Sequence, residues 1–97
     1  MPNVYLTTHG LRAELHGEQL RVSPTYPESD REKEDQTRVI PLHDVESVTV
    51  TRGCHLTTPA LIRCCENNIP IIFINNAGKV VATVRSPVLN PAARISQ

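Results

Sequence analysis

Two pairs of neighbouring residues carry side chains that could do acid–base or metal chemistry. His43-Asp44 has the composition of a general base with its orienting carboxylate. Adjacent residues on a strand point to opposite faces, however, and no nucleophile stands beside this pair. We therefore expect His43 and Asp44 to form a bend. The second pair, Cys54-His55, raises the question of metal binding.

The cysteines lack the spacing of a zinc site. Neither Cys54-His55 nor Cys64-Cys65 has the gap of about two to four residues through which two side chains reach one tetrahedral ion. We expect Cys65 to be a small buried hydrophobe on a helix, with a raised pKa, and Cys64 to be partly exposed. The glycines are dispersed at turns and form no phosphate loop. The sequence thus predicts no catalytic residue and no metal ligand.

Composition limits the class of protein. A chain of 97 residues supports one core and is too short for two. It has no Trp and one Phe, so a core of Val, Ile and Leu is expected. No run of about 18 apolar residues and no signal-peptide pattern are present, so we expect a cytoplasmic protein without membrane contact. The three cysteines are expected to be reduced.

The charges are unevenly distributed, although ten basic residues balance ten acidic ones. Residues 24–36 contain five acids against two bases, two prolines and no periodicity, and we expect a mobile charged loop there. From residue 52 onward, Glu66 is the one acid and the bases are Arg52, Arg63, Lys79, Arg85 and Arg94. The C-terminal half is therefore mildly basic, which is compatible with a nucleic-acid partner or with an ordinary solvated surface.

Alternating apolar residues predict strands along most of the chain. Expected strands cover residues 4–8, 11–16, 19–23, 38–42, 45–51, 69–74 and 79–84. Gly17 supplies a hairpin turn, Val48 and Val50 face the core, and residues 75–78 form the last turn. The run at 69–74 is nearly all apolar, so we expect a strand covered on both faces.

One short helix is expected at about residues 58–67. Thr57 and Thr58 precede Pro59, which favours a helix start with a capping hydroxyl, and Asn68 can take the left-handed conformation that ends a helix. We expect Leu61, Ile62 and Cys65 to form the buried stripe. The predicted fold is mainly β (α+β), a sandwich-like domain of about seven strands with one packed helix.

Four segments together carry a family resemblance. They are Tyr-Leu-Thr-Thr-His-Gly at 5–10, Ile-Pro-Leu-His-Asp-Val-Glu-Ser-Val at 40–48, Leu-Thr-Thr-Pro-Ala-Leu at 56–61 and Asn-Ile-Pro-Ile-Ile-Phe at 68–73. In this order they resemble the N-terminal β-domain of the CRISPR adaptation integrase-endonuclease, the first CRISPR-associated protein. The resemblance covers residues 3–85. It implies a β-domain at 1–85, and at 86–97 the start of a linker to a C-terminal helical domain that this chain lacks.

The resemblance also implies a function. Family members dimerise through this domain, assemble with the second, small CRISPR adaptation protein, and capture short double-stranded DNA for insertion as new spacers in adaptive antiviral defence. The full-length enzyme uses a divalent metal, Mg or Mn, held by Glu, His and Asp of the helical domain, and none of these positions can be carried over here. We therefore expect no cofactor in this fragment and no activity from it alone.

Five residues are candidates for DNA contact: His9, Arg52, Arg63, Lys79 and Arg85. His9 stands in a Thr-His-Gly turn where family members can present a ring to the end of the duplex, and stacking on a terminal base contributes about 1–3 kcal/mol without reading sequence. The alternative for His9 is a local hydrogen bond within the turn.

Two other functions stay open at this stage. A free-standing module could recruit a partner chain along an exposed sheet edge and never touch DNA. A metal or redox site at the cysteines would predict stoichiometric zinc. Salt dependence of binding separates the first from a DNA-binding domain, because phosphate contacts weaken steeply as salt rises.

Overall fold

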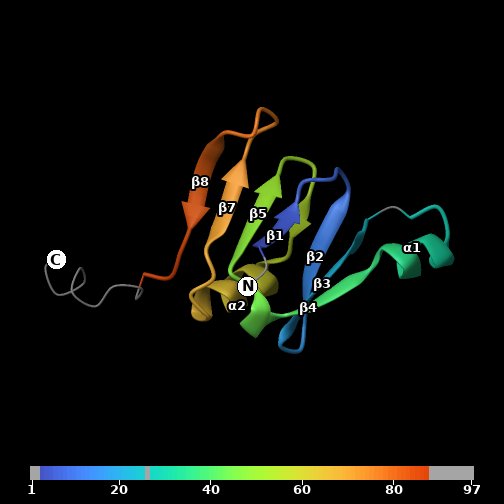
Figure 1. Cartoon of the computed structure of the whole chain (residues 1–97), viewed down its shortest axis with the longest axis horizontal. Helices are drawn as coiled ribbons and strands as arrows, with labels where there is room; N and C mark the ends of the chain where they lie inside the picture. The colour runs from blue at the N-terminus through green and yellow to red at the C-terminus, as the bar shows by residue number, and fades with distance from the viewer. Residues whose placement is uncertain (1–2, 26, 88–97) are drawn as a thin grey trace, which may run out of the picture.

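The computed structural model describes residues 3–25 and 27–87 (Figure 1). Within these residues the chain forms eight strands, two α-helices and one 3₁₀ turn. The strands are β1 (Asn3–Leu6), β2 (Leu11–His16), β3 (Gln19–Pro24), β4 (Arg38–Pro41), β5 (Ser47–Thr51), β6 (His55–Leu56), β7 (Ile71–Ile74) and β8 (Val80–Val84). The helices are α1 (Asp30–Gln36) and α2 (Thr58–Glu66), and the 3₁₀ turn is η1 (Leu42–Asp44). The mainly β prediction is confirmed, and the strand that it lacked is the two-residue β6.

The first sheet has the order β1-β5-β7-β8. β1, β5 and β7 are parallel, with Val4 opposite Val48 and Val48 opposite Ile71, whereas β8 returns antiparallel to β7. The carboxyl ends of three strands therefore meet at one edge of this sheet, the upper edge in Figure 1. The alternation of apolar residues predicted these strands but not their parallel pairing.

The second sheet has the order β4-β3-β2-β6. The β2–β3 hairpin is confirmed, and Gly17 turns it with a φ of 64°, which a residue without Cβ adopts freely. β6 pairs parallel with β2. The inner faces of the two sheets enclose the core, which includes Leu6, Leu20, Val48 and Ile71, all fully buried.

α2 packs against the sheets through a stripe that matches the expected one at Leu61, which lies against the core, but not at Ile62 and Cys65. Ala60 and Cys64 are fully buried, whereas Ile62 is 53% exposed and Cys65 only half-buried. The prediction for the cysteines was therefore wrong, because the helix phase is set by Ala60 and Cys64, four residues apart on the face that meets the sheets. Burial raises the pKa of the Cys64 thiol to about 11.

The ends of α2 agree with the sequence in part. Thr57 is the N-cap residue and Pro59 lies in the first turn, but no capping hydrogen bond from a side chain forms. Asn68 follows the helix with a φ of 59°, the left-handed conformation expected of it.

α1 corrects the prediction of a structureless charged loop. Ser29 caps the helix by accepting from the backbone N–H of Glu32 at 3.1 Å, and Asp30 and Glu32 place negative charge in the first turn. The Glu32 carboxylate in turn accepts from the N–H of Glu28 at 2.6 Å and from the amide of Gln36 at 3.3 Å. Local capping therefore compensates for the missing apolar stripe.

β7 is central in its sheet but is not covered on both faces along its whole length. Ile71 is fully buried, while the residues from Ile72 to Ile74 are half-exposed. His43 and Asp44 lie in the 3₁₀ turn η1, as the bend prediction required. No helix among the described residues is both long and apolar enough to cross a bilayer. Residues 88–97, most of the linker predicted at 86–97, lie outside the described residues.

Candidate nucleic-acid interface

Three loops meet at the carboxyl-end edge of the first sheet. They comprise residues 7–10 after β1, 52–54 after β5, and 75–79 between β7 and β8. A hollow of about 340 Å³ opens between them and is lined by Thr7, His9, Arg52, Asn75, Asn76 and Gly78, among others. Open sheets of parallel strands commonly bind ligands at this edge, because the loops there converge. Two of the five candidate residues, His9 and Arg52, thus line one hollow.

Hydrogen bonds fix the first two loops to each other. Gly10 donates its N–H to the carbonyl of Gly53 at 3.0 Å. The Thr51 hydroxyl donates to the Leu6 carbonyl at 3.1 Å, and the Cys54 thiol donates to the Thr8 carbonyl at the same distance. Because these bonds join segments more than 40 residues apart in sequence, they hold His9 and Arg52 in one rigid frame.

The His9 ring lies over the backbone of Gly53. A Cβ added at Gly53 would overlap ring atom Nδ1 and lie 2.8 Å from ring atom Cε1. Gly53 also has a φ of 91°, a conformation that side-chain-bearing residues rarely adopt. Glycine at this position therefore lets the ring approach the loop, and the side chain of His9 itself stays exposed.

The third loop is held by its own turn. The Asn75 side-chain oxygen accepts from the N–H groups of Ala77 and Lys79, both at 3.0 Å. Gly78 completes the turn with a φ of 81°. Lys79 follows directly, is exposed, and so carries a third candidate side chain to this edge.

Together the three loops are basic. They contain Arg52, Lys79 and His9, and none of their residues is acidic. An anion that approaches this edge therefore meets two cations and an aromatic ring with no carboxylate from these loops beside them. We call residues 7–10, 52–54 and 75–79 the basic edge.

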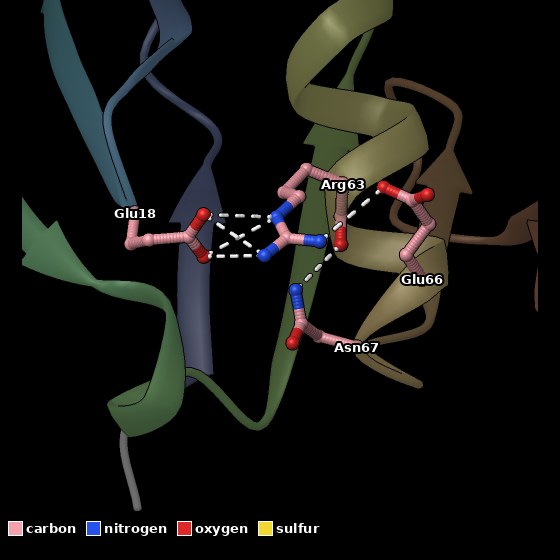
Figure 2. Close-up of polar contacts among 4 residues, drawn as sticks. All are labelled: Glu18, Arg63, Glu66 and Asn67. Carbon is pink, nitrogen blue, oxygen red and sulfur yellow. Dashed lines mark hydrogen bonds and ion pairs between the residues drawn. The ribbon is translucent and has the colours of Figure 1, made fainter.

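Arg63 lies at the opposite end of the molecule, where the β2–β3 turn and α2 meet (Figure 2). Its guanidinium donates four hydrogen bonds of 2.8–3.2 Å to the two carboxylate oxygens of Glu18. A second carboxylate, that of Glu66, lies 3.5 Å away. The hydrogen bonds and charge of Glu18 raise the pKa of Arg63 above its ordinary value. The positive charge of this candidate is therefore already paired with carboxylates of the same chain.

Arg85 also lies away from the basic edge. It lines a small hollow of about 90 Å³ with Asn68, Pro70 and Ser86, at the amino end of β7. Val84, its neighbour, is paired with Ile71. The five candidates thus divide into His9, Arg52 and Lys79 at one end and Arg63 and Arg85 at the other.

The remaining chemistry-bearing residues form no site. The His43 and Asp44 side chains approach to 3.4 Å, but both are largely exposed and lie on a turn. Cys54, Cys64 and Cys65 are free thiols. Among the described residues, no three side chains of His, Cys, Asp or Glu are close enough to share a metal ion.

The sequence did not reveal the roles of Gly53 and Asn75 at this edge. Both are recognisable as turn residues, but only the parallel order of β1, β5 and β7 brings their loops together. The sequence did offer one signal for this edge. Three strands of alternating apolar residues are each followed by a polar or basic turn, and these turns contain Thr-His-Gly, Arg-Gly and Asn-Asn.

Comparison with known proteins identifies relatives of this chain. The family model described as CRISPR associated protein Cas1 matches residues 4–97. No curated protein sequence matches.

Solved structures with this fold include a chain of a "Cas6-RT-Cas1--Cas2 complex", with a TM-score of 0.70 and 24% identity over 88% of this chain and 8% of that one. A CAS1 protein from Thermotoga maritima has a TM-score of 0.67 and 22% identity over 92% of this chain and 25% of its own. A "TtCas1-DNA complex" has a TM-score of 0.67 and 12% identity, over 91% of this chain and 30% of the matched chain. This chain therefore spans less than a third of the length of each of these three chains.

Proposed function

Because this chain belongs to the CRISPR-associated Cas1 family, we propose that it is the N-terminal domain of a spacer integrase, in which it serves as a dimerisation scaffold and contacts double-stranded DNA. Residues 1–85 would form this domain, and residues 86–97 would begin the linker to a catalytic helical domain. The described residues offer no cluster that fits Mg or Mn, so we assign them no step of the DNA chemistry.

The observation that carries the DNA role is the basic edge. His9, Arg52 and Lys79 come from three loops that the sheet brings together, and no carboxylate of those loops competes with a phosphate. Phosphate contacts of this kind are independent of sequence, which suits a protein that accepts DNA of many sequences. We propose that the exposed ring of His9, beside these two cations, stacks on a terminal base of the duplex.

The proposed partners are supported by what the solved relatives were found with. One solved relative is a Cas1-containing complex with Cas2, another is bound to DNA, and a third is a "Casposase bound to integration product". We propose that the full-length protein assembles, as those relatives do, with the small CRISPR adaptation protein and with double-stranded DNA. We also propose that it acts as a homodimer.

The test is DNA binding by matched arginine variants. Fluorescence anisotropy of a labelled duplex would be measured over a range of salt concentrations for the wild-type chain, Arg52→Ala and Arg85→Ala. Both variants remove one exposed arginine, but from opposite ends of the molecule. We expect Arg52→Ala to weaken binding by about threefold to tenfold and to reduce the slope against log salt by about 1, with Arg85→Ala within about twofold of wild type.

Two results would contradict the proposal. Equal losses in the two variants would mean that the basic edge is not the DNA surface. Absence of duplex binding even at low salt would instead favour a protein-interaction module that does not contact DNA.

A further inference from the structure

A tight turn presents His9 after the end of β1. The N–H of Leu11 donates to the carbonyl of Thr8 at 3.3 Å, which closes a β-turn over residues 8–11 with His9 as its second residue. Gly10, the third residue, has the positive φ of 89° that a type II turn requires at this place. The position of the His9 ring therefore depends on how this turn is fixed to the rest of the molecule.

Strand pairing alone does not fix the turn. The ladder between β1 and β5 ends at Leu6, three residues before His9. Beyond this point two side chains bind the backbone of the first loop. The Thr51 hydroxyl donates to the carbonyl of Leu6, and the Cys54 thiol donates to the carbonyl of Thr8, both at 3.1 Å. Of these two bonds, the one from Cys54 reaches the turn itself.

Cys54 connects the turn to the hydrophobic core. Its side chain is half-buried and packs against the core, while its Sγ binds the first carbonyl of the turn, that of Thr8. Its own backbone N–H donates to the carbonyl of Thr51 at 3.2 Å, so Cys54 is itself held at the end of β5. The thiol therefore joins the turn to a fixed part of the fold.

The two sides of His9 are held by different kinds of hydrogen bond. On the side of Gly10, a backbone bond of 3.0 Å runs to the carbonyl of Gly53. On the side of Thr8, the bond that crosses to residues 52–54 comes from the side chain of Cys54. A substitution of Cys54 can therefore release one side of the turn and leave the backbone bond on the other side in place.

We propose that Cys54 is the positioning residue of the His9 turn, and that its thiol keeps the ring over Gly53 in the place from which it stacks on a duplex end. The proposal rests on the proposed function, in which His9 stacks on a terminal base, and it identifies the side chain that holds His9 there. A ring that is already in place loses less conformational freedom on binding than a mobile one. Cys54 should therefore govern how strongly this chain prefers DNA with ends over DNA without them.

Two substitutions of Cys54 separate its hydrogen bond from its packing. Cys54→Ser keeps a donor but loses apolar contact, whereas Cys54→Val keeps apolar contact but has no donor. Fluorescence anisotropy of the 97-residue chain would give the affinities for a blunt duplex and for a closed dumbbell, whose two ends are capped by hairpin loops. We expect Cys54→Val to lower the ratio of these affinities by about fivefold, and Cys54→Ser to keep it within about twofold of wild type.

The matched control is Cys65→Val, which changes a second half-buried cysteine on α2. Its affinity ratio should stay within about twofold of wild type. Cys54→Val is also measured in a chain that carries His9→Ala. If the thiol acts through the ring, Cys54→Val should leave the ratio of that chain unchanged. A residue that only stabilised the fold would lower binding of both DNAs alike.

A measurement without DNA follows the ring itself. The His9 ring lies against Gly53, so its protons should show a nuclear Overhauser effect to the α protons of Gly53 in the wild-type chain. This effect should persist in Cys54→Ser and disappear in Cys54→Val, because only the valine lacks a donor to the Thr8 carbonyl.

The outcomes separate the two proposals. A ratio that falls in Cys54→Ser but not in Cys54→Val would assign the effect to packing and would overturn the positioning role of the thiol. An equal fall in the His9→Ala chain would overturn it as well. A wild-type chain that binds both DNAs equally, or neither, would contradict the stacking of His9 on duplex ends. The nuclear Overhauser effect would then test Cys54 alone: its loss in Cys54→Val would support the positioning role, and its persistence there would overturn it.

Discussion

At the basic edge, Arg52 and Lys79 stand in loops without an acidic residue, whereas at the opposite end Arg63 is bound by four hydrogen bonds to Glu18. Both ends carry exposed or half-exposed cations, and from the sequence alone they are equally good candidates for DNA contact. The difference lies in what already satisfies each cation. A guanidinium that is held by a carboxylate must give up that partner to bind phosphate, while one without such a partner need not.

At the end where Arg63 is paired with Glu18, α2 also buries Cys64. Burial of this thiol gives the largest predicted effect. Since the folded-state pKa is raised from 9.0 to about 11, the folded state holds the thiol proton more tightly than the unfolded state. The resulting stability is present below pH 9 and should be lost as pH rises from 9 toward 11, by about 2–3 kcal/mol in the free energy of unfolding. Urea unfolding at several pH values measures this decline.

The matched controls are the two adjacent cysteines. Cys64→Ala should flatten the decline relative to wild type, whereas Cys65→Ala, at a half-buried position, should retain it. A decline of equal size in Cys64→Ala would show that another group causes it.

At the basic edge, two glycines have nearly the same backbone conformation, and replacing Gly53 by alanine should destabilise the fold more than replacing Gly10. Gly53 and Gly10 have φ values of 91° and 89°, but only a Cβ at Gly53 meets the His9 ring. We expect Gly10→Ala to lower the free energy of unfolding by about 1 kcal/mol through backbone strain, and Gly53→Ala by about 2 kcal/mol, because the ring must also move. Thermal or urea unfolding compares the two, and equal losses would mean that the ring does not rest on Gly53.

His9 itself tests whether the basic edge captures duplex ends. His9→Ala should weaken binding of a blunt duplex by about tenfold through loss of stacking, and His9→Tyr, which keeps a ring, should restore most of it. The measurement is anisotropy with a blunt duplex and, as the control ligand, a closed dumbbell that has no exposed end. If the loss were the same for both ligands, His9 would act on the backbone or on the fold instead.

The sequence predicted most of this architecture wherever one face of an element is buried. The alternation in β2, β3 and β5 marked strands, and Val48 and Val50 point into the core as expected. Predictions were wrong for the two short helices. In these, the buried face or the stability of the helix is set by something other than the spacing of its own apolar residues. In α2, only contact with the sheets decides that Cys64 and not Cys65 is buried.

α1 was missed for a different reason. Its seven residues, Asp30–Gln36, contain no apolar side chain, so periodicity gave no signal. The signal was local: Ser29 followed three residues later by Glu32 is the pattern of a capped helix start. The basic edge could not be predicted as a unit, because the candidates Arg52 and Lys79 are joined only by the parallel pairing of β1, β5 and β7. Strand pairing depends on contacts between distant segments, which alternation within one strand does not encode.

The smallest predicted effect comes from releasing Arg63. Glu18→Gln removes the charge that holds the guanidinium but leaves Glu66, 3.5 Å from it, in place. Surface ion pairs contribute little to stability, so the melting temperature should fall by less than about 4 °C. Duplex affinity should change by less than about twofold, because a freed arginine at this end has no second cation of the basic edge beside it. A clear gain in affinity, measured by the same anisotropy titration, would show that Glu18 masks a second DNA-binding surface and that the two ends differ only in their present pairing.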